Sequence, residues 1–143
     1  MSFAAVKILL VEDNADDEAL TLRALRHHKM ADNVVVAHDG VEALDFLLSK
    51  EAKLSPLPHF VMLDLNLPRV NGHEVLKTLR ANARTCHLPV VVLSSSIEES
   101  DIQSCYLSGA NSYIRKPVDY RQFVDSVEKI GEYWLNLNQR PTC

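Results

Sequence analysis

The sequence predicts an α/β protein in which one parallel β-sheet is covered by helices on both faces. Five short runs of apolar residues each end abruptly in polar residues, and such runs indicate buried strands. Between the runs, apolar residues recur at the three- and four-residue spacing of amphipathic helices. Strands that alternate with helices predict a doubly wound sheet with right-handed crossovers. The 143 residues, 47% of them hydrophobic, suffice for one domain with its own core.

The five expected strands are short and rich in Val, Ile and Leu. They cover residues 6–11, 34–37, 60–63, 89–93 and 112–115. Each is followed by a polar residue, and the last is cut off by Lys116-Pro117. Because proline has no backbone N–H to donate, a buried strand ends there.

Five apolar stripes predict the helices between and after the strands. The stripes are Ala15, Ala19, Leu22 and Leu25; Val41, Leu44 and Leu48; Val75, Leu76 and Leu79; Ile102, Cys105 and Tyr106; and Phe123, Val127, Ile130 and Trp134. We expect the third helix to end near Arg84 and residues 50–59 to form a polar loop. Ser96-Ile97-Glu98-Glu99 has the pattern of a capping box, which predicts that the fourth helix begins there.

Composition and charge narrow the class of protein. The formal net charge is −4, which disfavours nucleic-acid binding. No apolar run is long enough to cross a membrane, and the first residues do not resemble a secretory signal. The three cysteines form no C-x-x-C pair, so reduced thiols in the cytoplasm are expected.

Polar side chains follow four of the five strands at the point where each strand ends. Glu12 and Asp13 follow the first strand, and Asp64 follows the third. Ser94 follows the fourth strand, and Lys116 follows the fifth. In a doubly wound sheet, the carboxyl ends of the strands meet at one edge, where ligands bind. We therefore expect these five side chains to form one site.

The charges of this site predict a divalent cation. Glu12, Asp13 and Asp64 together carry −3, and carboxylates in one crevice raise each other's pKa unless a cation is present. One divalent ion and Lys116 bring the sum to zero. Oxygen ligands select a hard ion, and Mg²⁺, which takes one or two carboxylates plus a phosphate, fits best.

This site also predicts a reaction. Carboxylates can act as nucleophiles and form aspartyl phosphates, and phosphoryl transfer needs mainly positioning and charge neutralisation. Asp64 is the carboxylate at the end of the central strand and is therefore the expected nucleophile. Lys116 neutralises the transferred group, and the Ser94 hydroxyl can hydrogen-bond to it. Asp16, Asp17 and Glu18 are interpreted as first-turn acids that favour the helix dipole.

At these residues the sequence resembles the receiver domain of two-component response regulators. The resemblance covers residues 6–130 and rests on V-E-D-N at 11–14, L-D-L-N-L-P at 63–68 with Gly72, L-S-S-S at 93–96 and S-Y-I-R-K-P at 112–117. It implies a flavodoxin-like receiver fold with strand order 2-1-3-4-5.

The resemblance also implies a role for each site residue. Asp64 would be the phosphoacceptor, and Lys116 would pair with the phosphate. Asp13 would be the direct Mg²⁺ ligand, Glu12 would act largely through water, and the backbone carbonyl of Asn66 would be the third protein ligand. Ser94 and Tyr113 would be the switch residues. The peptide bond before Pro117 would be cis.

At the level of the whole chain, the sequence is similar to single-domain response regulators. It is interpreted as one receiver domain over residues 1–143, with a core of about 6–131, an extension at 132–143 and no output domain. The string D-L-N-L-P-R-V-N-G, the long loop 48–59 and the apolar tail resemble regulators that work with phytochrome-type histidine kinases. Tyr133, Leu135 and Leu137 in that tail predict a homodimer through the last helix, the fifth strand and the tail.

Two other functions remain open at this stage. A Mg²⁺-dependent phosphatase would also use an aspartyl phosphate, but such enzymes usually carry a second Asp where Asn66 stands here. An inactive receiver-like scaffold is disfavoured by intact Asp13, Asp64 and Lys116. In the favoured interpretation the protein is not an enzyme and acts only on its own phosphoryl group.

Overall fold

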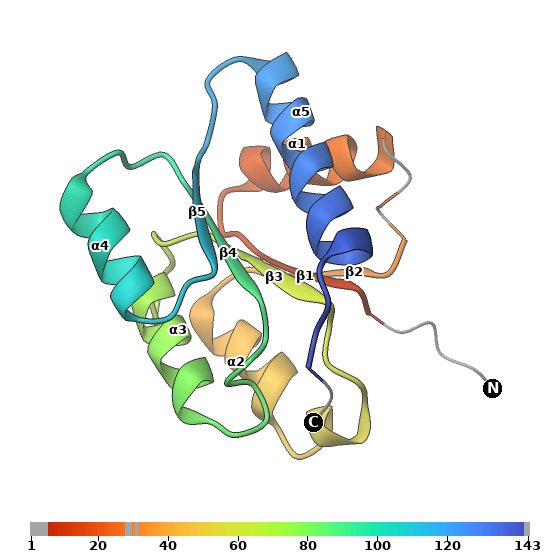
Figure 1. Ribbon diagram of the computed structural model, residues 1–143, viewed down its shortest axis with the longest axis vertical. Helices are drawn as coiled ribbons and strands as arrows, with labels where there is room; N and C mark the ends of the chain where they lie inside the picture. Colours follow the sequence, from red (N-terminus) through yellow and green to blue (C-terminus); the bar gives the residue numbers. More distant parts are fainter. Residues whose placement is uncertain (1–5, 28–29, 31, 142–143) are drawn as a thin grey trace.

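The chain folds into a five-stranded parallel sheet between two layers of helices, in the order that the sequence predicts (Figure 1). A computed structural model describes residues 6–27, 30 and 32–141. The strands, paired in the order β2-β1-β3-β4-β5, are β1 (Ile8–Val11), β2 (Val34–Ala37), β3 (Phe60–Leu63), β4 (Val90–Ser94) and β5 (Ser112–Arg115). The helices are α1 (Ala15–His27), α2 (Gly40–Leu48), α3 (Gly72–Ala81), α4 (Glu99–Leu107) and α5 (Tyr120–Gly131).

Two hydrophobic cores lie on opposite faces of the sheet. Alternate strand residues point to opposite faces, so Leu9 and Val11 pack toward α2, α3 and α4, while Ile8 and Leu10 pack toward α1 and α5. Because β1, β3 and β4 are buried on both faces, they are apolar throughout rather than alternating.

The strand register brings the predicted site residues to one edge. Val11 is aligned with Leu63, and Leu63 is aligned with Val92. The residues that follow, Glu12 and Asp64, therefore leave the sheet at the same level. The Asp64 N–H donates to the carbonyl of Val11 at 3.1 Å.

The loop between β3 and α3 is held tightly against the start of α2. Arg69 has a φ of 65°, a conformation that L residues seldom adopt, and its guanidinium pairs with the carboxylate of Asp39 at 3.1 Å. A Cβ atom placed on Gly40 would lie 2.0 Å from the carbonyl oxygen of Val70 in this loop. The absence of a side chain at Gly40 thus permits the close approach of the two segments.

Two arginines tie loops together at the opposite end of the sheet. Arg84 donates to the carbonyls of Leu47, Ala52 and Ser55, so the predicted polar loop is ordered and contains a 3-10 turn at Ala52–Leu54. Arg80 donates to the carbonyl of Gly109 at 2.9 Å and joins α3 to the turn after α4.

The ends of α3 and α4 differ from the prediction. α4 begins at Glu99 rather than Ser96, because the Ser96 hydroxyl accepts from the N–H of Glu98 and donates to Asp101 within a loop. Cys105 is the one buried side chain of α4. Glu98, the N-cap residue of the helix, makes no side-chain cap hydrogen bond. α3 ends at Ala81, before the predicted Arg84.

Of two smaller expectations, one held in part and the other was wrong. Leu44 and Leu48 of the predicted α2 stripe pack against the core but, like Val41, are only partly buried, and the buried side chains of α2 are Ala43 and Leu47. The described residues contain no cis peptide bond, so the bond before Pro117 is trans, the isomer that X–Pro bonds favour by about 0.5–1 kcal/mol.

A π-helical turn at Glu132–Leu137 directly continues α5. Trp134 and Leu135 pack against the core under α1 and α5. Tyr133 and Leu137 remain exposed, at 48% and 64%. The predicted apolar tail is therefore divided between the chain's own core and its surface.

Candidate functional site

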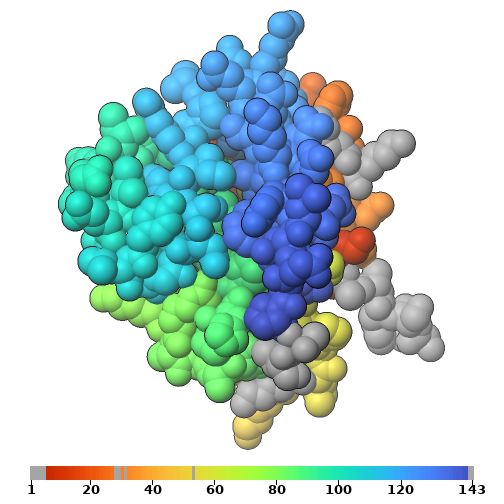
Figure 2. All heavy atoms as spheres, in the orientation of Figure 1, coloured from red at the N-terminus to blue at the C-terminus, as the bar shows by residue number. Residues whose placement is uncertain are grey.

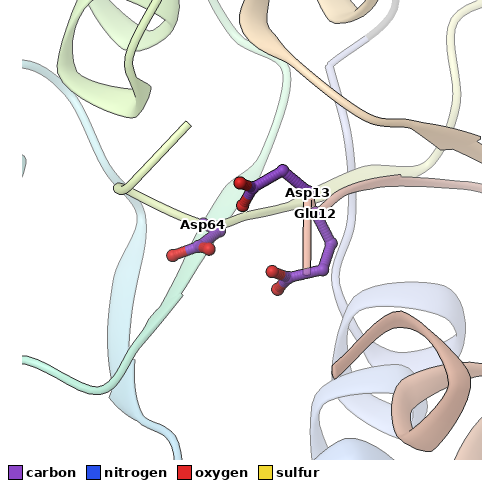
Figure 3. Close-up of side chains that lie close together, drawn as sticks. All are labelled: Glu12, Asp13 and Asp64. Atoms are coloured by element: carbon purple, nitrogen blue, oxygen red, sulfur yellow. The ribbon is translucent and has the colours of Figure 1, made fainter. Parts of the chain in front are cut away.

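Three carboxylates from two adjacent strand ends gather at one point of the sheet edge (Figure 3). Glu12 and Asp13 follow β1, and Asp64 follows β3. One carboxylate oxygen from each residue lies within 4.8 Å of the others. Glu12 and Asp64 are buried, at 2% and 7% exposure, whereas Asp13 is exposed. The cluster therefore has a buried floor and one carboxylate at its opening.

Lys116 reaches this cluster from the end of β5. Its Nζ atom lies 2.9 Å from an oxygen of Glu12 and 3.7 Å from an oxygen of Asp64. The backbone N–H of Lys116 also donates to the carbonyl of Ser94 at 2.7 Å, and this hydrogen bond fixes the backbone of Lys116 beside β4. The five side chains predicted from the strand ends thus converge on one edge.

A fourth acid that was not predicted as a site residue also contacts Lys116. Asp17, interpreted as a first-turn acid of α1, places a carboxylate oxygen 2.9 Å from Nζ of Lys116. The signal in the sequence was its spacing, since Asp17 lies four residues after Asp13 and α1 begins at Ala15. A first-turn residue on the face toward β1 can turn back over the end of that strand.

Burial dominates the acid–base properties of the site. It raises the pKa of Glu12 to about 7, against the hydrogen bond from Lys116, which lowers it. For Lys116 burial lowers the pKa, but the hydrogen bonds to Asp17 and Glu12 outweigh burial and raise the pKa above its ordinary value. The site thus holds a protonated lysine beside an acid that ionises reluctantly.

Without divalent ions, we expect the stability of the protein to fall as the pH rises from about 4.5 to about 7. In that range the folded protein keeps the Glu12 proton that the unfolded chain has released, because the pKa rises from 4.5 to about 7 on folding. The loss should be on the order of 3 kcal/mol, at about 1.4 kcal/mol per pKa unit. Urea denaturation in EDTA across this range measures it.

Glu12→Gln should remove most of this pH dependence, whereas Glu51→Gln, a change at an exposed acid, should leave it in place. A Glu12→Gln protein with the same slope as the wild type would show that another group titrates.

The predicted switch residues are linked through the loop after β4. Ser94 is fully buried, and its hydroxyl oxygen accepts from the N–H of Ser96 at 3.2 Å. The Tyr113 hydroxyl donates to the carbonyl of Ser96 at 2.8 Å. Ser96 therefore connects the hydroxyl at the site to the aromatic residue on β5.

Asn66 is exposed, and its N–H donates to the Oδ1 atom of Asp64 at 3.3 Å. Beside it, a cavity of about 500 Å³ is bounded by the loops after β3 and β4, with Asn66, His73, Ser94 and Asp101 among its lining residues. The cavity is lined by Leu65, which follows Asp64, and by Ser94 at the end of β4. His73 of α3 and Asp101 of α4 also line it.

The donor set fits a hard divalent cation. All the clustered side chains offer carboxylate oxygens, and Glu12 and Asp64 are buried with Lys116 as a shared cation. Buried carboxylates of this number need more positive charge than one lysine supplies. Oxygen-only ligands are those of Mg²⁺ and Mn²⁺.

Asp13→Asn should weaken Mg²⁺ binding by about ten-fold or more, and Glu12→Gln should weaken it less. Asp13 is the exposed carboxylate of the cluster, whereas Glu12 already pairs with Lys116. Isothermal titration with MgCl₂ gives both affinities. An Asp13→Asn protein that binds Mg²⁺ as tightly as the wild type would contradict the assignment of Asp13 as a ligand.

Comparisons with known proteins agree with this arrangement. Residues 8–128 match the response regulator receiver domain. The chain is 40% identical over 134 residues to the probable methanogenesis regulatory protein FilR2 of Methanothrix harundinacea, covering 94% of this chain and 86% of that protein. It is 35% identical over 137 residues to response regulator Rcp1 of Synechocystis, covering 95% and 93%.

Solved structures show the same similarity. The phosphorylated cyanobacterial phytochrome response regulator RcpA superposes with a TM-score of 0.87 at 38% identity, covering 97% of this chain and all of that one, 100%. The Mn²⁺-bound form of Rcp1 superposes with a TM-score of 0.84 at 34% identity, covering 94% of this chain and 98% of that chain.

In the described part of the chain, no helix has the length and hydropathy needed to span a membrane.

Proposed function

The chain belongs to the response regulator receiver family, and from that membership we propose that it accepts a phosphoryl group on Asp64 from a sensor histidine kinase. Phosphorylation on an Asp and Mg²⁺ binding are typical of this family. The observation that carries the proposal is the placement of Asp64. It is buried at the end of the central strand, beside two acids and 3.7 Å from Lys116.

In the proposed reaction, a carboxylate oxygen of Asp64 forms a bond to phosphorus while the bond from phosphorus to the kinase histidine nitrogen breaks. The histidine keeps the electron pair of that bond and takes up a proton. Lys116 stabilises the negative charge of the transferred group, and the Ser94 hydroxyl donates to one of its oxygens. Mg²⁺ bound by Asp13, Asp64 and the Asn66 carbonyl, with Glu12 acting through water, would neutralise further charge.

Acetyl phosphate tests this assignment without a kinase. We expect the intact mass of the protein to increase by one phosphoryl group in MgCl₂ and to stay unchanged in EDTA. Phosphorylation of equal yield in EDTA would overturn the proposed role of the metal.

The signal would pass from Asp64 to Tyr113 through Ser94 and Ser96. The phosphoryl group carries about −2 where the carboxylate carried −1. A hydroxyl drawn toward that charge pulls on the Ser96 N–H, and the Ser96 carbonyl holds the Tyr113 hydroxyl. In this proposal the protein acts by a change of surface and catalyses only its own phosphorylation and dephosphorylation.

We propose a phytochrome-type histidine kinase as the phosphodonor. Support comes from the similarity to RcpA, which is described as a phytochrome response regulator. The test is transfer of labelled phosphate from an autophosphorylated phytochrome kinase, with an unrelated histidine kinase as the control. Equal transfer rates from both kinases would contradict the pairing.

We propose that the protein works in the cytoplasm. The free thiols of Cys86 and Cys105 support this location, because the cytoplasm is a reducing compartment.

The alternative function, a Mg²⁺-dependent phosphatase, has less support than the receiver function. Family membership explains the acidic cluster and the lysine without a separate substrate. The position of the second Asp that such enzymes usually carry is occupied here by Asn66.

We also propose that the protein forms a homodimer through α5, β5 and the C-terminal segment. These elements lie together with α4 on one face (Figure 2). Apolar side chains near this face are exposed, with Val118 at 96% and Leu137 at 64%. Tyr133 adds to the exposed surface of the segment, whereas Trp134 and Leu135 belong to the chain's own core.

Leu137→Ser should weaken the dimer by about ten-fold, the loss expected for one exposed leucine that becomes buried on association. Leu54→Ser removes a leucine that is more exposed, at 87%, from the 3-10 turn and should leave the dimer unchanged. Sedimentation at tens of micromolar, with and without beryllofluoride, measures both. A wild-type protein that is monomeric under both conditions would exclude the dimer.

A further inference from the structure

Lys116 is shared between more carboxylates than its charge can neutralise. Its Nζ atom lies 2.9 Å from Glu12, 2.9 Å from Asp17 and 3.7 Å from Asp64. In the absence of a phosphoryl group, the two close partners are therefore Glu12 and Asp17 rather than the phosphoacceptor.

We propose that Asp17 is a positioning residue that holds Lys116 back from Asp64 and is released when Asp64 is phosphorylated. This inference rests on the proposed phosphorylation of Asp64. In this arrangement Asp17 competes with the phosphoryl group for one ammonium, and so it sets how readily the phosphorylated state forms.

The backbone of Asp17 is fixed from both sides. Its N–H donates to the side chain of Asn14 at 2.9 Å, and its carbonyl accepts from the hydroxyl of buried Thr21 at 2.8 Å. The carboxylate is therefore held over the end of β1 by α1 itself. Its position does not depend on the loops that carry Asn66 and Ser96.

Burial decides which partner of Lys116 yields. The side chain of Glu12 is 3% exposed, so a Glu12 carboxylate left without Lys116 would be unpaired in the protein interior. The side chain of Asp17 is 37% exposed, and water can solvate it when the lysine moves away. Asp17 is therefore the partner that Lys116 can leave at low cost.

Charge supplies the driving force. Phosphorylation changes the charge at Asp64 from −1 to about −2. The attraction of Lys116 toward Asp64 then increases, while its attraction toward Asp17 does not change. If the ammonium moves toward that Asp64 oxygen by the difference between 3.7 Å and 2.9 Å, the two come as close as Lys116 and Asp17 are now.

Beryllofluoride, a non-covalent mimic of the phosphoryl group, tests the proposal in the full chain. Asp17→Asn should bind beryllofluoride at least about three-fold more tightly than the wild type, measured by fluorine NMR in MgCl₂. Asp16→Asn is the matched control, because it removes the same charge from an exposed neighbour. Asp16→Asn should change the affinity for beryllofluoride by less than half of the factor expected for Asp17→Asn.

The double variant Asp17→Asn/Lys116→Ala shows whether Asp17 acts through the lysine. In the Lys116→Ala background, Asp17→Asn should have no more effect than Asp16→Asn. Asp17→Glu should restore the wild-type affinity, since it returns the carboxylate. Equal effects of Asp17→Asn and Asp16→Asn, or a full Asp17→Asn effect without Lys116, would overturn the proposal.

These outcomes are distinct from failure of the proposed function. Should the wild type bind no beryllofluoride and gain no phosphoryl mass, the assignment of Asp64 itself would fail. If the wild type is phosphorylated and Asp17→Asn behaves like Asp16→Asn, the role of Asp17 alone is refuted. Asp17→Ser gives a second test of the same contact if Asp17→Asn does not fold.

Discussion

Asp64→Asn is expected to abolish phosphorylation by acetyl phosphate, the largest functional effect of any single change considered. The amide keeps the shape of the side chain but is a poor nucleophile, so no acyl phosphate forms. The site places no other carboxylate at the end of the central strand, and Glu12 is occupied by Lys116 at 2.9 Å. Intact-mass measurement after incubation in MgCl₂ should show only the unmodified protein.

The fold should survive this change. Removing one of several clustered acids relieves repulsion, so we expect the Asp64→Asn protein to be at least as stable as the wild type without metal. Asp16→Asn, at an exposed position of α1, serves as the control and should be phosphorylated normally. A phosphoryl adduct of normal yield on Asp64→Asn would show that another residue is the acceptor.

Gly40→Ala is expected to cause the largest loss of stability, about 3 kcal/mol. The new Cβ atom would lie 2.0 Å from the Val70 carbonyl oxygen, and the obstructing atoms include backbone that cannot rotate away. The β3–α3 loop must then shift, and with it the contact between Arg69 and Asp39. Urea denaturation gives the free energy of unfolding, and MgCl₂ titration reports whether the metal site moves with the loop.

Gly131→Ala is the matched control for this prediction. Its Cβ would lie 2.2 Å from the sulfur of Met30, the far end of a flexible side chain. Met30 can move aside, and alanine favours the helix by about 1 kcal/mol over glycine. The net change should be small. Equal losses for the two variants would mean that the α2–loop contact is not rigid.

The fold was predictable because the strands are short, mostly apolar runs that each end at a polar residue. Val34–Ala37, Phe60–Leu63 and Ser112–Arg115 lie where the apolar runs placed them. The strand order came from the resemblance to receiver domains, since alternating strands and helices fit several orders. The start of α4 was not predictable from the local pattern, because the Ser96 hydroxyl bonds to Asp101 instead of capping a helix.

The site was predictable where a residue directly follows a strand. Glu12, Asp64 and Lys116 could be placed together because the carboxyl ends of parallel strands share an edge. Asp17 was missed, because it lies in the first turn of α1 and its contact with Lys116 depends on how that turn lies over the end of β1. The π-helical turn after α5 was not predictable from the local pattern. Trp134 was expected in the apolar stripe of the last helix, but Leu135 was assigned to a dimer surface and instead packs against the chain's own core.

α4 buries one side chain, Cys105, and begins without a side-chain cap. Its other contacts include hydrogen bonds from the Ser96 hydroxyl to Asp101 and from the Tyr113 N–H to the Tyr106 hydroxyl. Local opening of such a helix exposes little apolar surface, so its free energy should lie well below that of global unfolding. We therefore expect a minor population in which α4 is displaced while the sheet stays intact. A contact that favours either arrangement by about 1.4 kcal/mol changes their ratio ten-fold, so small forces from the loop at Ser96 suffice to redistribute the ensemble.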